Sequence, residues 1–152
     1  MQAHTCKHGI WNLDGRFDSA ALVNGQVRMP EYELCLQAES ASAGASLGSA
    51  DCGDAETQTW MLQDSSEFAL AASQQLCVTI EEGPGIDAGG PQYVRRGVRL
   101  ETCSPQASDR QRWTTAAPQY LRYSIYSNVS LPFSKTTSPS TFMVASERNS
   151  HW

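Results

Sequence analysis

The chain has 152 residues, the size of one domain, and only 18% of them are charged. Its formal net charge of −5 argues against binding nucleic acid through the phosphates, because such binding needs a basic surface. No window approaches the roughly 20 apolar residues of a membrane-spanning helix, and the first residues lack the apolar run typical of a signal peptide.

The N-terminal segment has the pattern of the closing part of a repeat. Cys6 precedes Trp11 by five residues, and residues 11–17 resemble the segments that follow the later tryptophans. We therefore expect the chain to begin inside one repeat and to end where the last strand of the third repeat should begin. Cys6 has no evident partner in the sequence, which leaves a free thiol, an intermolecular bond or a missing upstream cysteine as alternatives.

Residues 20–29 have the pattern of a β-hairpin. The pair Asn24-Gly25 is typical of two-residue hairpin loops, and it separates residues 20–23 from residues 26–29. We predict two short strands joined by this turn.

A repeated unit occupies the middle of the chain: Leu-Cys-apolar, a loop, a second cysteine and Gln-x-Trp. The first copy consists of Leu34-Cys35-Leu36, Cys52 and Gln58-Thr59-Trp60, and the second of Leu76-Cys77-Val78, Cys103 and Gln111-Arg112-Trp113. Five cysteines in a chain of this size indicate a disulfide framework formed in an oxidising compartment.

A third copy follows without cysteines. The first motif tryptophan lies 17 residues before the next opening cysteine, and the same step from the second motif tryptophan reaches Ser130. The partner cysteine would fall near Ser146 and the motif tryptophan at Trp152. Because the third copy lacks both cysteines together, we expect a bond within each of the other copies, joining Cys35 to Cys52 and Cys77 to Cys103.

Several short runs predict strands because they are rich in β-branched or aromatic residues and are bounded by Gly, Pro and Ser. These runs are residues 32–38, 76–80, 94–100 and 120–126. Residues 40–50 and 83–90 lack helical apolar spacing, and we predict loops there. Residues 68–75 could form a short helix, but a strand followed by a turn is the preferred interpretation.

Two Gln-x-Trp triplets in register, the paired cysteines before them and the third copy resemble the ricin-B (R-type, Q-x-W) lectin family over essentially the whole chain. The resemblance implies an all-β fold, a β-trefoil of three pseudo-repeats, in a single domain over residues 1–152. Its approximate parts are 1–33, 34–75, 76–128 and 129–152. It also implies that the motif tryptophans pack in the core and the motif glutamines bond to backbone, which makes these positions structural: Trp11, Gln58, Trp60, Gln111, Trp113 and Trp152.

The sugar-binding positions of that family do not carry over well. Sugar-binding repeats place an Asp two residues after the opening cysteine, an aromatic ring two residues before the second, and an Asn next to the motif Gln. A sugar site needs a polar acceptor for hydroxyls and an apolar platform for the sugar face. The corresponding residues here are Gln37, Thr79 and Pro132, then Ala50, Glu101 and Val144, then Thr57, Arg110 and Asn149. Galactose binding of the usual sort is therefore not expected.

A displaced binding site is the remaining candidate. Tyr93 precedes the predicted strand 94–100 and could stack on a sugar, with Gln92 and Arg95 as hydrogen-bonding neighbours; packing at a strand edge is the alternative. Asn149 completes this set of candidate ligand-binding residues. We interpret the one basic cluster, Arg95, Arg96 and Arg99, as solvated loop charge rather than a phosphate site.

Enzymatic activity has no support in the sequence, which contains no nucleophile elbow. The carboxylates, such as Glu81 and Glu82, read as surface charge, because sequence alone cannot place two of them at the separation needed for glycoside hydrolysis. His4, His8 and His151 could approach Cys6 in a metal site, but their spacing matches no known ligand pattern. We expect no enzyme, metal site or cofactor.

These expectations combine into a secreted, lectin-like binding module whose leader is absent from this chain. A glycan or glycoprotein is the partner that the family resemblance implies. The alternative is a trefoil that does not bind sugar and acts as a protein-interaction or targeting subunit of a larger secreted assembly or toxin. Neither a nucleic-acid partner nor a membrane span is expected.

Overall fold

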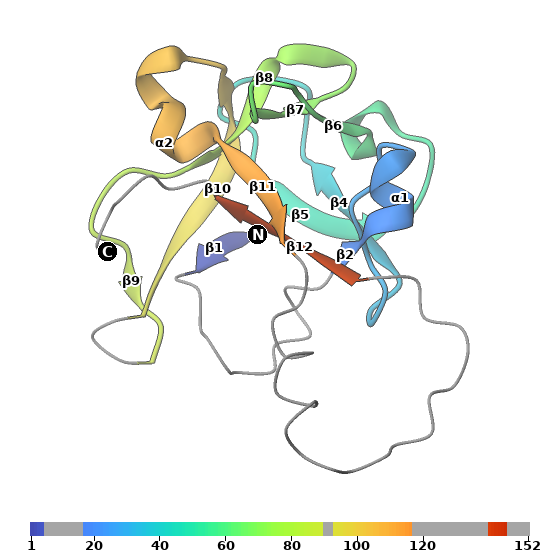
Figure 1. The fold of residues 1–152 in the computed structure, drawn as a ribbon, viewed down its shortest axis with the longest axis horizontal. Coiled ribbons are helices and arrows are strands. Elements are labelled where there is room, and N and C mark those ends of the chain that lie inside the picture. Colours follow the sequence, from blue (N-terminus) through green and yellow to red (C-terminus); the bar gives the residue numbers. More distant parts are fainter. Residues whose placement is uncertain (5–16, 90–92, 117–139, 146–152) are drawn as a thin grey trace.

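The computed structural model describes residues 1–4, 17–89, 93–116 and 140–145, which form mainly short strands (Figure 1). The strands are β1 (Gln2–His4), β2 (Phe17–Asp18), β3 (Arg28–Met29), β4 (Leu34–Ala38), β5 (Leu47–Asp51), β6 (Trp60–Leu62), β7 (Phe68–Leu70), β8 (Ser73–Ile80), β9 (Ile86–Asp87), β10 (Val94–Thr102), β11 (Trp113–Ala116) and β12 (Ser140–Ala145). The helical segments are α1 (Ser19–Val23), α2 (Ser108–Gln111) and two 3-10 turns, Glu56–Gln58 and Pro105–Ala107. The all-β prediction is confirmed.

The described strands pair only in the antiparallel sense and form three sheets. One sheet has the order β1-β10-β8-β7-β6, with β9 also on β10; the second is β11-β12-β2 and the third is β3-β4-β5. The pairing of β2 with β12, through Asp18 and Ser140, joins an early part of the chain to a late one. The fold is therefore held by contacts that are distant in sequence.

The two cysteine-containing copies have the same local structure. In each, the first cysteine lies on a strand, β4 or β8, and the second directly follows the paired strand, β5 or β10. A short helical segment then carries the motif glutamine, and a strand begins at the motif tryptophan. The sequence repeat is thus a structural repeat.

The core is built around the two motif tryptophans. Trp60 and Trp113 are buried, and each indole N–H donates to the carbonyl of the residue after the first cysteine: to Leu36 at 3.0 Å and to Val78 at 2.9 Å. Trp60 also stacks on Phe68, with ring centroids 5.3 Å apart. Each tryptophan therefore supplies apolar area and satisfies its one polar atom inside the core.

The predicted hairpin at residues 20–29 is wrong. Residues Ser19–Val23 form α1, because the Asp18 carboxylate accepts hydrogen bonds from the backbone N–H groups of Ala20 and Ala21 and caps the helix. Gly25, at φ +82°, follows the helix C-cap Asn24, and its N–H donates to the Leu22 carbonyl at 2.9 Å. Asn-Gly therefore ends a helix here, a use of left-handed glycine that resembles a hairpin signal in sequence.

Three further expectations need correction or limits. The predicted loop 40–50 contains the start of β5, and the predicted loop 83–90 contains β9, because both segments pair with a neighbouring strand. Arg95, Arg96 and Arg99 lie on β10 and not in a loop.

The strand and turn expected at residues 68–75 are confirmed by β7 and the start of β8. The strand predicted at 120–126, Trp11, Trp152 and Cys6 lie outside the described residues.

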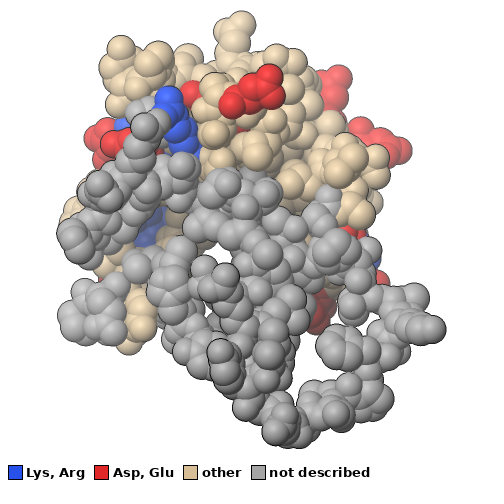
Figure 2. All heavy atoms as spheres, viewed as in Figure 1, with Lys and Arg blue, Asp and Glu red and all other residues tan. Residues whose placement is uncertain are grey.

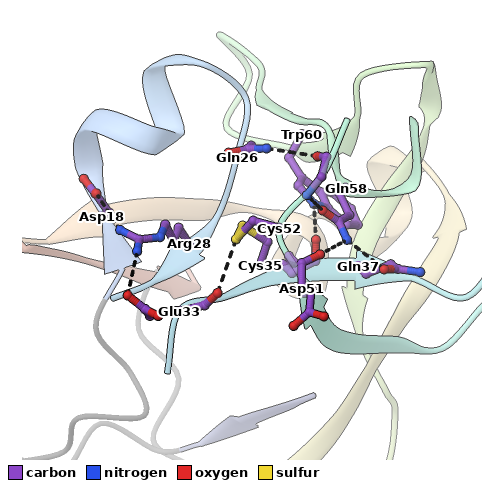
Figure 3. Close-up of a disulfide and its surroundings, with 12 residues drawn as sticks. Asp18, Gln26, Arg28, Glu33, Cys35, Gln37, Asp51, Cys52, Gln58 and Trp60 are labelled. Carbon is purple, nitrogen blue, oxygen red and sulfur yellow. Dashed lines mark hydrogen bonds and ion pairs between the residues drawn. A yellow bond between two sulfur atoms is a disulfide. The ribbon is translucent and has the colours of Figure 1, made fainter. Parts of the chain in front are cut away.

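Both predicted disulfides are present: Cys77 is bonded to Cys103, and Cys35 is bonded to Cys52 (Figure 3). They close loops with sequence separations of 17 and 26 residues. Cys35 and Cys77 have no exposed surface, so each disulfide joins a core strand to a segment nearer the surface.

Replacing Cys77 and Cys103 together by serine should lower the free energy of unfolding by about 3 kcal/mol, because the bond restricts the unfolded chain. Urea denaturation followed by tryptophan fluorescence measures the change. The Cys35→Ser, Cys52→Ser double variant should show a similar loss. An unchanged midpoint in both double variants would contradict a stabilising role for the two bonds.

Candidate functional site

The motif glutamines hold each copy together around its second cysteine. Gln58 is 3% exposed; its amide nitrogen donates to the Asp51 carbonyl at 2.9 Å, and its Oε1 accepts from the Gly53 N–H at 2.8 Å (Figure 3). Asp51 and Gly53 flank Cys52. The side chain therefore satisfies backbone groups on both sides of the disulfide in a buried position, where unpaired groups would be costly.

Gln111 repeats this arrangement in the second copy. Its amide nitrogen donates to the Thr102 carbonyl at 3.0 Å, and its Oε1 accepts from the Ser104 N–H at 2.8 Å. Thr102 and Ser104 flank Cys103. The same glutamine geometry thus recurs in both copies.

The motif glutamines also bind the residues that stand where a sugar-binding aspartate is expected. The Gln58 amide nitrogen donates to Gln37 Oε1 at 2.8 Å, and the Gln111 amide nitrogen donates to Thr79 Oγ1 at 2.9 Å. Thr79 is 1% exposed and donates its own hydroxyl to the Cys77 carbonyl. Neither position therefore offers a free carboxylate to a sugar hydroxyl. In Figure 3 the amide nitrogen of Gln37 points away from Gln58, so this group can donate outward.

The first copy has a solvent-open concavity beside the β4–β5 hairpin, with a volume of about 240 Å³. Gly48 lies opposite Gln37 in the pairing, and Ala50 lies opposite Cys35. These small residues stand where larger side chains would fill the space. We call this feature the first-copy concavity. The residues that line it are Gln37, Glu39, Ser46, Leu47, Gly48, Ser49 and Ala50.

The corresponding part of the second copy contains ion pairs. Arg99 lies opposite Thr79, as Gly48 lies opposite Gln37, and its guanidinium pairs with Glu81. The hydrogen bond and charge of Glu81 raise the pKa of Arg99 above its ordinary value, so the guanidinium stays protonated.

Arg110, at the position before the motif glutamine, fixes the neighbouring segment of the second copy. It donates to the Ile80 carbonyl at 3.1 Å and pairs with Glu82 at 2.8 Å. The Arg110 side chain therefore binds the segment that follows the opening cysteine. The family's sugar-binding repeats have an asparagine at the position of Arg110.

The sequence-predicted ligand residues lie elsewhere. Tyr93 directly precedes β10 and is half-buried, and its carbonyl accepts from the Ala88 N–H at 2.9 Å. Arg95 lies on β10 opposite His4 and Ile86, and it donates to Gln2 Oε1 at 3.2 Å. Neither lines the first-copy concavity. Gln92 and Asn149 lie outside the described residues.

Sequence reasoning missed the first-copy concavity because residues 40–50 read as a plain loop. One signal was available: Glu39 and Glu81 both stand four residues after the opening cysteine of their copies. The same alignment of the copies pairs Arg99 with Gly48, because each stands four residues before the second cysteine.

The described part of the chain meets neither the requirements of a metal cluster nor those of a membrane-spanning helix. No group of three His, Cys, Asp or Glu side chains lies together there in a way that could hold a metal ion. His8 and His151 lie outside this part, so the proposed histidine cluster is not described. No helix in it is long and apolar enough to cross a membrane.

Comparison with known families agrees with this geometry. The ricin-type beta-trefoil lectin domain matches residues 23–150. The chain therefore belongs to this family, and its all-β fold is a β-trefoil. Such domains are carbohydrate-binding modules. A search of curated proteins found no match.

Replacing Gln58 by alanine should lower the free energy of unfolding by about 2 kcal/mol, because it leaves the Gly53 N–H and the Asp51 carbonyl without their side-chain partner. Gln111→Ala should have a similar effect. Gln63→Ala is the matched control, since Gln63 is only partly buried and its side-chain bond to the Gln74 carbonyl is exposed. Urea denaturation distinguishes them; equal midpoints for Gln58→Ala and Gln63→Ala would contradict the structural role of the motif.

Proposed function

We propose that this chain is a non-catalytic carbohydrate-binding module and that the first-copy concavity is its sugar site. The observation that carries the proposal is the difference between the two copies. The first has an open concavity beside its motif glutamine, whereas the second has Arg99 at the position of Gly48. Membership of a lectin family supports a sugar as the ligand.

The lining of the concavity suits a small polyhydroxylated ligand. The Gln37 amide nitrogen and the Ser46 hydroxyl can donate hydrogen bonds, and the Glu39 carboxylate can accept them. A sugar hydroxyl both donates and accepts, so a mixed set of this kind can fix its orientation. The lining contains no aromatic ring, and we therefore expect weak binding by a single site.

The segment around Tyr93 remains a second proposed location on the same module. Tyr93 with Arg95 and Gln92 would combine a ring with hydrogen-bonding groups, and Asn149 is the remaining family position with a matching residue. The half-burial of Tyr93 leaves part of its surface exposed.

Gly48→Leu should abolish specific binding on a glycan array, because the new side chain enters the concavity. An added Cβ at Gly48 meets nothing within 4 Å, so the substitution should leave the fold intact. Thermal unfolding of the variant checks this. Tyr93→Ala, tested in parallel, should retain binding.

The reverse result would place the site at the β9–β10 end: binding lost in Tyr93→Ala and retained in Gly48→Leu. Specific binding retained in both variants would reject both locations. Absence of binding to every neutral, charged and amino sugar on the array, for the oxidised protein, would contradict the carbohydrate function itself.

A second candidate function is a trefoil that has lost sugar binding and serves as a protein-interaction or targeting subunit of a secreted assembly or toxin. The observation that favours it is the occupation of Gln37 and Thr79 by the motif glutamines, which removes the usual acceptor from both described copies. A negative glycan array together with a defined complex containing a native partner protein would support it. Either function fits a secreted protein, since two disulfides require oxidising conditions to form.

A further inference from the structure

The two copies place a glutamate at the same structural position. The Glu39 N–H donates to the Ser46 carbonyl, and the Glu81 N–H donates to the Gly97 carbonyl, both at 2.9 Å. Each glutamate directly follows the first strand of its copy. Its partner is on the facing segment: Ser46 directly precedes β5, and Gly97 lies within β10. The second copy therefore shows how this position interacts with a cation.

In the second copy that cation is Arg99. Its guanidinium pairs with the Glu81 carboxylate, and its Nε lies 4.0 Å from Glu101 Oε1. Arg99 reaches Glu81 from the strand position opposite Thr79. The protein thus fills this site with a positively charged group of its own.

In the first copy the corresponding cation is missing. Gly48 takes the place of Arg99, and Glu39 lines the open concavity with no ion-pair partner among the residues in the described ranges. A positively charged group entering the concavity would meet Glu39 as Arg99 meets Glu81. The whole chain has a net charge of −5, and acidic side chains lie on the described part of the face shown in Figure 2.

A second difference lies at the residue that accepts the hydrogen bond from the glutamate N–H. A side chain at Gly97 would collide with the Glu81 carboxylate, so glycine lets Glu81 lie against the paired strand. Ser46 replaces that glycine in the first copy and occupies the corresponding space. Ser46 also pairs with Arg99 across an isolated antiparallel bridge, so the two sites are neighbours, but the Arg99 guanidinium is engaged by Glu81.

We propose that the first-copy concavity selects sugars that carry a protonated amine, with Glu39 accepting the ammonium group. The Ser46 hydroxyl and the outward Gln37 amide then bind hydroxyl oxygens of the sugar. This inference rests on the proposed carbohydrate function and names the ligand class of the same site. Membership of a lectin family favours a sugar over an arginine or lysine side chain as the carrier of the charge.

Titration calorimetry with two matched ligands tests the inference: the β1,4-linked trimer of glucosamine and its fully N-acetylated counterpart. They share one backbone, and at mildly acidic pH, where the experiment is run, the glucosamine trimer is cationic whereas the acetylated trimer is neutral. The oxidised protein should bind the glucosamine trimer about three- to fivefold more tightly, as expected for one solvent-open ion pair, and the preference should disappear at about 0.5 M salt.

Three variants test whether Glu39 is the residue that causes the preference for the amine. Glu39→Gln keeps the shape of the side chain and should remove the preference for the amine. Gly48→Arg should also remove it, because it recreates the arrangement of the second copy and supplies an internal guanidinium to Glu39; the added Cβ has room. Glu56→Gln, outside the concavity, makes the same charge change and should retain the preference.

Equal or tighter binding of the acetylated trimer would overturn the amine preference while leaving the carbohydrate function in place. An amine preference that persists in Glu39→Gln would show adsorption to the acidic surface in general and would also overturn it. If neither trimer binds, the inference is rejected, and the glycan array separately decides whether the module binds any other sugar. Equally strong binding of free arginine would reject a sugar as the selected source of the cation.

Discussion

The hydrogen bonds of the two motif glutamines are the constraint on which the rest of the structure depends. In each copy one amide joins three segments: the residue before the second cysteine, the residue after it and the opening strand. The neighbouring disulfide covalently joins the opening strand to the second cysteine. The motif tryptophan, two residues after the glutamine, is buried in the core. A buried amide with all its partners in place specifies one arrangement, because any other leaves polar groups unpaired.

This constraint also shapes the binding surface. The glutamines donate their third hydrogen bond to Gln37 and Thr79, which stand at the positions where a sugar-binding repeat would have an aspartate. The hydrogen bonds that hold the fold together therefore engage two positions that would otherwise contact a sugar. What remains for a ligand in the first copy is the outward half of Gln37 and the side chains around Gly48, and in the second copy ion pairs occupy the corresponding place.

Comparing the two copies is informative because they share a backbone arrangement and differ in a few side chains. Arg99 of the second copy corresponds to Gly48 of the first, and Gly97 corresponds to Ser46. With these two differences the second site is occupied by a side chain of the protein and the first site is open. Both copies keep the glutamate, Glu81 or Glu39. A repeat protein can in this way show, in one copy, the chemistry that another copy has available for a ligand. Function in such a fold resides in the side chains placed on it and not in the fold itself.

The sequence by itself determined the repeat, the disulfide pairing and the all-β class, because fixed spacings of Cys, Gln and Trp reflect local geometry that each copy must satisfy. It did not determine whether Asn24-Gly25 turns a hairpin or ends a helix, since both need a left-handed glycine and the Asp18 cap decided between them. Nor could it locate the concavity. That depended on which residues lie opposite Gln37 and Thr79, and strand register is set by tertiary packing and not by neighbours in the chain.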